Sequence, residues 1–420
     1  MPRITILAVG SRGDVQPFAA LALGLQAAGY SVRLATHAPF REFVERHGLE
    51  FAPLVGDPLA AITSSMGQTA LHAGRNPVTF LRLFVKEGLP HLAQLNDDSW
   101  AAAQGSDAVV FSTLAVAGYH IAQKLRIPSF AVHLQPNTRT RQYPTMFLPQ
   151  SLNLGGALNL LTHRVAEQAF WQAIRTNHNR WLRERLDLQP EPFFGPYAAM
   201  QAARLPVLYP FSTAVQPRPA DWPAWHHVTG YWHLHTEAGW QPPQDLLDFL
   251  DSGPPPIYIG FGSMANRRAR QAAEIVVAAL RRTGQRGILL SGWGGLSPSD
   301  LSENIHLIDA VPHAWLFSRM AAVVHHGGAG TTAAGLRAGV PSILIPHFAD
   351  QPYWAERVKS LGVGPAGIPR AKLTTHRLAR AIRRALTDAQ MRESAAALGK
   401  KLRAEDGVAT AVGIVSRYLR

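Results

Sequence analysis

The chain has 420 residues, of which 47% are hydrophobic and 16% are charged, a composition typical of a globular protein with two or three domains rather than a disordered one. It contains no cysteine, which excludes disulfide bonds and thiolate metal sites and favours an intracellular location. The formal net charge is +13, but the basic residues are scattered and do not alternate with base-stacking aromatic residues, so nucleic acid is not a predicted partner.

The first ten residues, MPRITILAVG, lack the apolar segment and cleavage site of a signal peptide, and we expect a first β-strand there. No stretch of 18 uninterrupted apolar residues predicts a membrane-spanning helix. The expected location is therefore cytoplasmic. The arginine excess is interpreted first as solvated helix surface. An anionic small molecule, or transient contact with the anionic inner face of a membrane, is the alternative.

The N-terminal half shows a repeated strand–helix pattern. Residues 4–10 are predicted as a strand, 11–17 as a loop and 18–29 as a helix. Strands rich in Val, Ile, Leu and Phe continue to alternate with helices as far as residue 134. Such continuous apolar strands predict a parallel sheet covered by helices on both faces.

Two less regular segments follow. Residues 137–200 form a helix-bearing insertion, where we expect partner-specific contacts. Residues 216–243 are rich in proline and tryptophan and are predicted to connect two domains, with one short strand near 226–232.

The strand–helix pattern restarts at residue 256 with a strand that runs into a Gly-Ser loop. Further strands are expected at 286–292, 304–310, 321–326 and 341–347, with helices between most of them. The fold class predicted is α/β, with two doubly wound, Rossmann-like domains that face a central cleft.

The most informative stretch is VVHHGGAGTTAAGLRAGVP at 323–341, where an apolar strand ends at two histidines before a glycine-rich turn and a helix. A helix N-terminus presents unpaired N–H groups and the positive end of its dipole, so this turn is suited to a diphosphate. Neither a Walker loop nor a Gly-x-Gly-x-x-Gly dinucleotide motif is present. The simpler interpretation is a tight turn with a buried histidine.

Two long motifs then carry a family resemblance. HHGGAGTTAAGLRAGVPSILIPHFADQPYWAERV resembles the sugar-nucleotide signature of glycosyltransferase family 1, which has the GT-B fold. GSRGDVQPFAALALGLQAAGYSVRLATH resembles the N-terminal signature of its sterol glucosyltransferase-like and antibiotic glycosyltransferase branch. The resemblance implies an acceptor-binding domain at 1–215, a linker at 216–243, a nucleotide-sugar-binding domain at 244–398 and, at 399–420, a helix that crosses back to the first domain.

The resemblance also implies roles in binding a UDP-sugar, which would be a co-substrate, with no further cofactor. For the diphosphate the matching positions are Ser263, His326, Gly328, Gly330 and Thr331. For the base and ribose they are Val311 and Trp293, although Trp293 is more readily interpreted as a core aromatic residue. For the sugar hydroxyls they are Asp350 and Gln351, which can accept and donate hydrogen bonds respectively.

Asp14 is the predicted catalytic base. It follows the first strand at the carboxyl edge of the predicted sheet, and sugar transfer requires a group that removes the proton of the acceptor hydroxyl. Plant members of the family have histidine here with an aspartate partner, whose position falls near Ser112 and Thr113, so a lone aspartate is expected instead. Asp14 is also interpretable as the cap of a helix that begins near Pro17. His37, His133 and Arg12 are auxiliary candidates.

No metal is predicted, because the chain has no Asp-x-Asp motif and His233 and His235 lack a third ligand at a recognisable spacing. The expected reaction is metal-independent transfer of a hexose, glucose by default, with inversion, to a lipophilic hydroxylated acceptor such as a sterol. Alternatives are a UDP- or dTDP-sugar transferase acting on a macrolide, flavonoid or glycolipid, a GT-B sugar-nucleotide epimerase, and a non-catalytic auxiliary protein.

Overall fold

The computed structural model describes the chain except for residues 59, 61–63, 65–66, 68–76, 153, 235–238, 262–266, 291–301, 310 and 420, and except for the side chains of 77, 80 and 267–269. The described chain forms two compact units. The first comprises residues 1–62, 77–234 and 405–420, and the second is built on residues 235–404.

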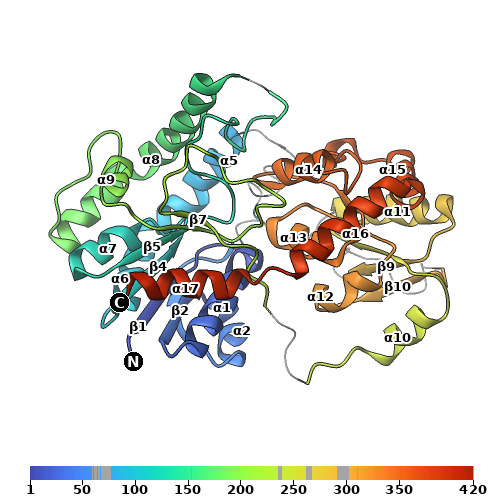
Figure 1. Cartoon of the computed structure of the whole chain (residues 1–420), viewed down its shortest axis with the longest axis horizontal. Coiled ribbons are helices and arrows are strands. Elements are labelled where there is room, and N and C mark those ends of the chain that lie inside the picture. Colours follow the sequence, from blue (N-terminus) through green and yellow to red (C-terminus); the bar gives the residue numbers. More distant parts are fainter. Residues whose placement is uncertain are drawn as a thin grey trace. The chain divides into compact units, whose positions relative to one another are not determined.

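The N-terminal unit contains a seven-stranded, fully parallel sheet with the order β3-β2-β1-β4-β5-β6-β7 (Figure 1). Its strands are β1 (Arg3–Leu7), β2 (Ser31–His37), β3 (Glu50–Leu54), β4 (Ala108–Ser112), β5 (Ser129–Val132), β6 (Val207–Tyr209) and β7 (His226–Val228). Its longer helices are α1 (Arg12–Ala27), α2 (Arg41–Arg46), α5 (Pro77–Leu83), α6 (Leu92–Ala102), α7 (Ala117–Leu125), α8 (Gly156–Leu186), α9 (Tyr197–Ala202) and α17 (Gly407–Tyr418). Short helical turns lie at η1 (Ala38–Phe40), η2 (Phe84–Gly88) and η3 (Leu89–His91).

The C-terminal unit contains a five-stranded parallel sheet with the order β10-β9-β8-β11-β12. Its strands are β8 (Ile257–Gly260), β9 (Gly287–Leu290), β10 (Ile305–Ile308), β11 (Ala322–His325) and β12 (Ser342–Leu344). Its helices are α10 (Gln244–Asp251), α11 (Arg267–Thr283), α12 (His313–Leu316), α13 (Ala329–Ala338), α14 (Gln351–Ser360), α15 (Thr375–Thr387) and α16 (Ala389–Arg403), with the turns η5 (Phe317–Arg319) and η6 (Arg370–Lys372).

Both sheets confirm the predicted α/β class with two doubly wound parallel sheets. In each sheet the order of strands reverses beside its first strand, between β1 and β4 and between β8 and β11. The carboxyl ends of the strands at such a reversal are where open α/β sheets bind ligands. Asp14 lies after β1 and His326 lies after β11, so both predicted residues follow strands at these switch points.

The last helix, α17, packs against α1 in the N-terminal unit. Ala411, Ile414 and Val415 are buried in the same apolar cluster as the inner side of α1. A side chain at Gly24 on α1 would collide with Val408, so glycine permits the two helices to approach closely. Residues 405–420 are therefore part of the N-terminal core, although they follow the C-terminal unit in sequence.

A chain of buried hydrogen bonds joins α6, α7 and α8. His120 Nε2 donates to Glu191 Oε1 at 2.9 Å, and His178 Nε2 donates to His120 Nδ1 at 3.2 Å. The Asn96 amide then donates to His178 Nδ1 at 3.4 Å. Each ring can thus use one nitrogen as a donor and the other as an acceptor. Burial lowers the pKa of His178 to about 3.

We expect the chain to lose stability between pH 6.5 and about 4. Burial also lowers the pKa of His226 to about 3 and that of His133 to about 4. Because the unfolded chain protonates these residues near pH 6.5 and the folded chain does not, each contributes full stability above pH 6.5. Below pH 6.5, each histidine lowers the free energy of unfolding by about 1.4 kcal/mol per pH unit. Urea unfolding at pH 7 and pH 5 measures this loss, which His178→Gln should make smaller by about 2 kcal/mol. An unfolding free energy independent of pH would contradict the prediction.

Candidate active site

The two adjacent histidines at the end of β11 have different surroundings. His325 is 0% exposed, and its Nδ1 accepts a hydrogen bond from the Gly327 N–H at 3.1 Å. Burial lowers the pKa of His325 well below its ordinary value, so the ring is neutral with its proton on Nε2. His325 therefore holds the turn in place and is not available to a ligand through Nδ1.

His326 is half-buried, and burial lowers its pKa to about 4. In the described part of the chain its Nδ1 is buried and has no hydrogen-bond partner. A buried ring nitrogen without a partner is costly, and binding of a ligand would supply the missing hydrogen bond. The ring is neutral at pH 7, so it can donate one N–H to an anion without carrying a charge itself.

The glycines that follow are required by geometry. Gly327 has φ +93°, and an added Cβ would lie 3.1 Å from Leu344 Cδ2 and 3.3 Å from the Gln351 carbonyl oxygen. At Gly328 an added Cβ would lie 2.7 Å from Nε2 of His326. Any other residue at these two positions would strain the turn or displace the imidazole.

Helix α13 begins at Ala329, two residues before the predicted start at Thr331, with Gly328 as its N-cap. The first hydrogen bond of the helix runs from the Thr332 N–H to the Gly328 carbonyl at 2.9 Å. The N–H groups of Ala329, Gly330 and Thr331 therefore have no carbonyl partner within the helix. They form a cluster of donors at the positive end of the helix dipole, beside His326. Thr331 lies in this first turn, so it does not serve as the N-cap of the helix.

The predicted sugar-binding pair lies next to this turn, because an added Cβ at Gly327 would lie 3.5 Å from Gln351 Cβ. Gln351 is buried, and its Oε1 accepts hydrogen bonds from the N–H groups of His347 at 2.8 Å and Phe348 at 3.3 Å. The amide oxygen is thus committed to the backbone, and a ligand would meet the amide only as a donor.

Asp350 is the N-cap residue of α14, and its Oδ2 accepts a hydrogen bond from the Trp354 indole at 2.9 Å. The sequence analysis did not predict this contact. The spacing of four residues between Asp350 and Trp354 on a predicted helix is the pattern that could have indicated it. The preceding residue, Ala349, has φ +54°, a conformation that non-glycine residues rarely adopt and that is concentrated at functional sites.

Asp14 is positioned by the loop after β1. The Ser11 N–H and the Ser11 hydroxyl both donate to Asp14 Oδ2, each at 2.8 Å. Gly10 has φ +139°, and an added Cβ would lie 2.5 Å from the same oxygen. No donor to the other oxygen, Oδ1, occurs among the residues that the structure describes. Burial raises the pKa of Asp14, and the hydrogen bonds from Ser11 partly oppose this change.

The start of α1 differs from the prediction. The helix begins at Arg12, not near Pro17, and Asp14 lies in its first turn. Ser11 is the N-cap residue, and the acidic side chain three positions later receives its N–H, which is the interaction that stabilises such a start. Pro17 is accommodated inside the helix, where it cannot donate the usual hydrogen bond to the Gly13 carbonyl.

The auxiliary histidines have structural partners. His37 Nε2 accepts from the Gly10 N–H at 3.2 Å and its Nδ1 donates to the Val55 carbonyl at 3.0 Å, and burial lowers its pKa. His133 follows β5 and its Nδ1 is 2.8 Å from the Thr113 hydroxyl. The Arg12 guanidinium lies 5.5 Å from the centre of the Phe43 ring. These contacts support the interpretation that His37 stabilises the loop that carries Asp14.

Two segments of the chain match domains of known proteins. Residues 4–144 match the glycosyltransferase family 28 N-terminal domain, and residues 295–414 match the erythromycin biosynthesis protein CIII-like C-terminal domain. A sterol 3-beta-glucosyltransferase of Cryptococcus neoformans var. neoformans is 40% identical over 99% of this chain. One of Neosartorya fischeri is also 40% identical over 99% of the chain.

The chain has the GT-B fold, and two of its segments match domains of glycosyltransferases. It spans 27% of the Cryptococcus protein and 29% of the Neosartorya protein. Solved structures with the same fold include the glycotransferase of kitacinnamycin (TM-score 0.72, 20% identity, 100% of both chains) and the calicheamicin glycosyltransferase CalG4 (TM-score 0.70, 18% identity, 100% of this chain and 98% of the other). The N-terminal match is described as family 28, whereas the sequence resemblance was to family 1.

The remaining predicted donor-site positions are Val311, Ser263 and Trp293. Val311 is half-buried and packs against the apolar cluster that includes Leu316 of α12. Ser263 and Trp293 lie outside the described residues. Asp14 belongs to the N-terminal unit, and the described donor-site candidates belong to the C-terminal unit.

Proposed function

We propose that this chain is an inverting, metal-independent glycosyltransferase that transfers glucose from UDP-glucose to a hydroxyl group of a sterol or a related lipophilic acceptor. The observation that carries the proposal is the 40% identity over 99% of the chain with proteins named sterol 3-beta-glucosyltransferase. The geometry of the turn after β11 supports it, because that turn offers neutral imidazole and backbone donors to a diphosphate.

The donor would bind on the C-terminal unit. His326, Gly328, Gly330 and Thr331 would contact the diphosphate, with Ser263 from the Gly-Ser loop as a further contact. Backbone N–H groups at a helix N-terminus stabilise the charge that develops on the leaving nucleoside diphosphate, and they need no rearrangement to do so. This stabilisation supports transfer without a metal ion.

The sugar and the base would be recognised by side chains with different roles. The Asp350 carboxylate would accept hydrogen bonds from the sugar hydroxyls, and the Gln351 amide would donate, because its oxygen is already occupied by backbone N–H groups. Val311 and Trp293 would contact the base and ribose.

Asp14 would act as the base on the acceptor side. Its Oδ2 is held by Ser11, so Oδ1 is the oxygen that would receive the proton of the acceptor hydroxyl. The acceptor oxygen then forms a bond to the anomeric carbon while the bond to the UDP oxygen breaks. Direct attack on an α-linked donor gives a β-glycoside. The raised pKa of Asp14 makes its carboxylate a better proton acceptor.

The test is release of UDP from UDP-glucose with a panel of sterols, flavonoids and macrolides, combined with identification of the glycoside. We expect sterol-dependent release of UDP and a β-linked product. Epimerisation of a nucleotide sugar without an acceptor would replace this proposal with that of a GT-B epimerase. No binding of any nucleotide sugar would indicate a non-catalytic auxiliary protein.

A further inference from the structure

Exposed apolar side chains are concentrated on one part of the N-terminal unit. Ten large apolar residues are exposed among the residues that the structure describes, and six of them lie between positions 152 and 194. Surface apolar residues are ordinary when single, but a contiguous group marks a contact surface. The six are Leu152, Leu158, Leu161, Val165, Phe193 and Phe194.

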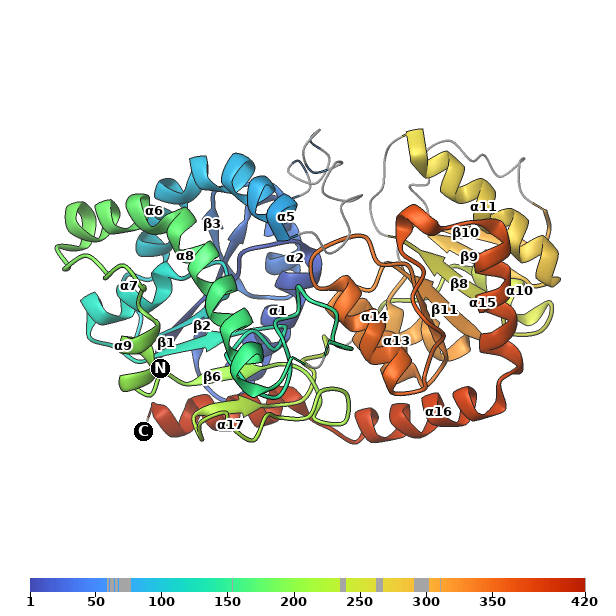
Figure 2. The ribbon, with the colours of Figure 1, turned by 90° about the horizontal axis from the view of Figure 1, so that it is seen from above.

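Helix α8 packs on α6 and α7 (Figures 1 and 2). Three of the six residues lie on the face of α8 away from its buried residues. Leu158, Leu161 and Val165 are spaced by three and four residues, so they follow one line along the helix. They are 53%, 51% and 59% exposed. The buried face of the same helix carries Trp171 and Ile174.

The segment after α8 extends this apolar line. The Gln168 and Gln172 amides donate to the carbonyl oxygens of Phe194 at 3.0 Å and Phe193 at 2.7 Å. Gly195 follows with φ +80°, and an added Cβ there would lie 3.0 Å from the Trp171 ring. The two phenylalanines are therefore held against α8, although they are 56% and 70% exposed. We define Leu158, Leu161, Val165, Phe193 and Phe194 as the α8 apolar face.

The charge around the α8 apolar face is positive. Helix α8 carries five arginines and two glutamates. Arg164 lies between Leu161 and Val165, the Arg175 guanidinium lies 5.1 Å from the centre of the Phe193 ring, and Arg183 continues the helical spacing of the exposed face. Of the two glutamates, Glu167 is paired with Arg139. An apolar surface bordered by arginines is complementary to an anionic lipid surface.

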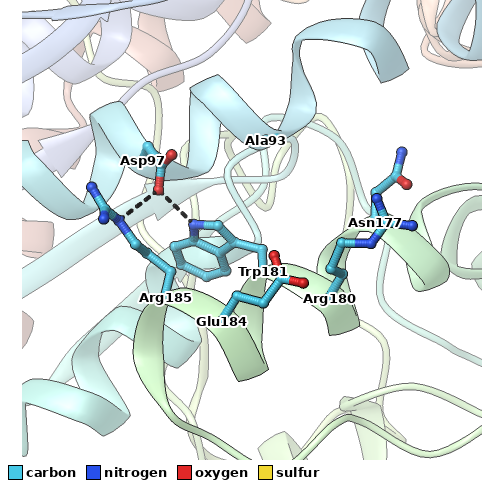
Figure 3. A pocket seen from close by; sticks show the side chains of 7 residues that line it. All are labelled: Ala93, Asp97, Asn177, Arg180, Trp181, Glu184 and Arg185. Atoms are coloured by element: carbon cyan, nitrogen blue, oxygen red, sulfur yellow. Dashed lines mark hydrogen bonds and ion pairs between the residues drawn. The ribbon is translucent and has the colours of Figure 1, made fainter.

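Arg185, at the far end of α8, contributes less to this charge. A pocket of about 370 Å³ lies between α6 and α8 (Figure 3). In it Asp97 Oδ1 accepts hydrogen bonds from the Trp181 indole at 3.0 Å and from Arg185 at 3.1 Å. Arg185 is thus neutralised locally, and Glu184 lines the same pocket, so we exclude this pocket from the proposed surface.

We propose that the α8 apolar face docks on an anionic lipid bilayer, with its leucines, valine and phenylalanines in the boundary between head groups and acyl chains and with Arg164, Arg175 and Arg183 on lipid phosphates. Within the described residues no helix is both long and apolar enough to cross a membrane. The proposal goes beyond the proposed function, because docking requires no turnover.

The test is flotation of the full chain with vesicles of phosphatidylcholine, with and without phosphatidylglycerol. We expect binding to the mixed vesicles that decreases with added salt. Phe193→Ser with Phe194→Ser should weaken binding about tenfold or more, since it removes the most exposed apolar area. Arg164→Gln, Arg175→Gln and Arg183→Gln together should abolish the preference for phosphatidylglycerol.

The matched control is Arg380→Gln, Arg383→Gln and Arg392→Gln, which removes the same charge from exposed positions of the C-terminal unit. This control should bind vesicles like the wild type. Equal binding by the phenylalanine variant, or equal loss in the control, would overturn the proposal. So would a wild-type chain that ignores vesicles and instead self-associates through these phenylalanines. Release of UDP with detergent-solubilised sterol is measured separately, and its absence would contradict the proposed function while leaving vesicle binding intact.

Discussion

Asp14→Asn should lower kcat by roughly 10²–10⁴-fold while UDP-glucose binding stays unchanged, because the substitution removes the proposed base and keeps its shape. An asparagine oxygen can still accept the two hydrogen bonds from Ser11, so the start of α1 should be preserved. Steady-state kinetics and titration of UDP-glucose binding measure the two effects. Unchanged kcat would remove Asp14 from the mechanism, and lost donor binding would indicate misfolding.

The pH dependence of kcat/KM tests independently whether Asp14 is the base. Burial raises the pKa of Asp14, and only its carboxylate form accepts a proton, so kcat/KM should fall as pH decreases through this raised pKa. Ser11→Ala removes one hydrogen bond that lowers the pKa of Asp14. The acid limb of the profile should therefore move to higher pH in this variant. If the acid limb lies at the same pH in the wild type and in Ser11→Ala, the group that titrates there is not Asp14.

His326→Ala should lower kcat/KM by about 10- to 100-fold, which is the effect of losing one hydrogen bond to a charged phosphate. Its effect on the free energy of unfolding should be small, because His326 Nδ1 has no partner among the described residues. Since burial lowers the pKa of His326 to about 4, the ring should stay neutral and its contribution to UDP binding should stay constant from pH 5.5 to 8.

The adjacent histidine is the matched control. His325→Ala removes the acceptor of the Gly327 N–H and leaves a cavity, so it should lower the free energy of unfolding by roughly 2–4 kcal/mol. Urea unfolding and calorimetric titration of UDP separate the two variants. If His325→Ala weakens UDP binding without a loss of stability, and His326→Ala does the reverse, the assignment of the two histidines is wrong.

The architecture was predictable from the sequence because its signals are local. Apolar strands that alternate with helices, first from residue 4 and again from residue 256, predict two doubly wound sheets, and both sheets are present. The glycine run after β11 also predicts its own turn, since only glycine adopts φ +93° at Gly327 without strain. The resemblance to GT-B glycosyltransferases rests on these same segments, and the family comparisons confirm it.

Helix boundaries were less predictable. Residues 11–17 are predicted as a loop, but Ser11 and Asp14 stabilise a helix that starts at Arg12. Helix α13 likewise begins at Ala329 rather than at Thr331. In both cases the N-terminal turn is decided by side-chain and backbone hydrogen bonds that a pattern of apolar residues does not contain.

By itself, the sequence determined the two parallel sheets, the order of their elements and the chemistry present at the ends of β1, β11 and β12, because apolar periodicity and residue type are properties of neighbouring residues. Only the tertiary structure decided that His325 supports the turn through Nδ1 and that the Gln351 oxygen is occupied by the backbone. It also decided that His326 Nδ1 has no partner among the described residues. It also decided that the apolar residues of α8 remain exposed. These outcomes depend on burial and on contacts between segments distant in sequence, and residue type alone does not specify either.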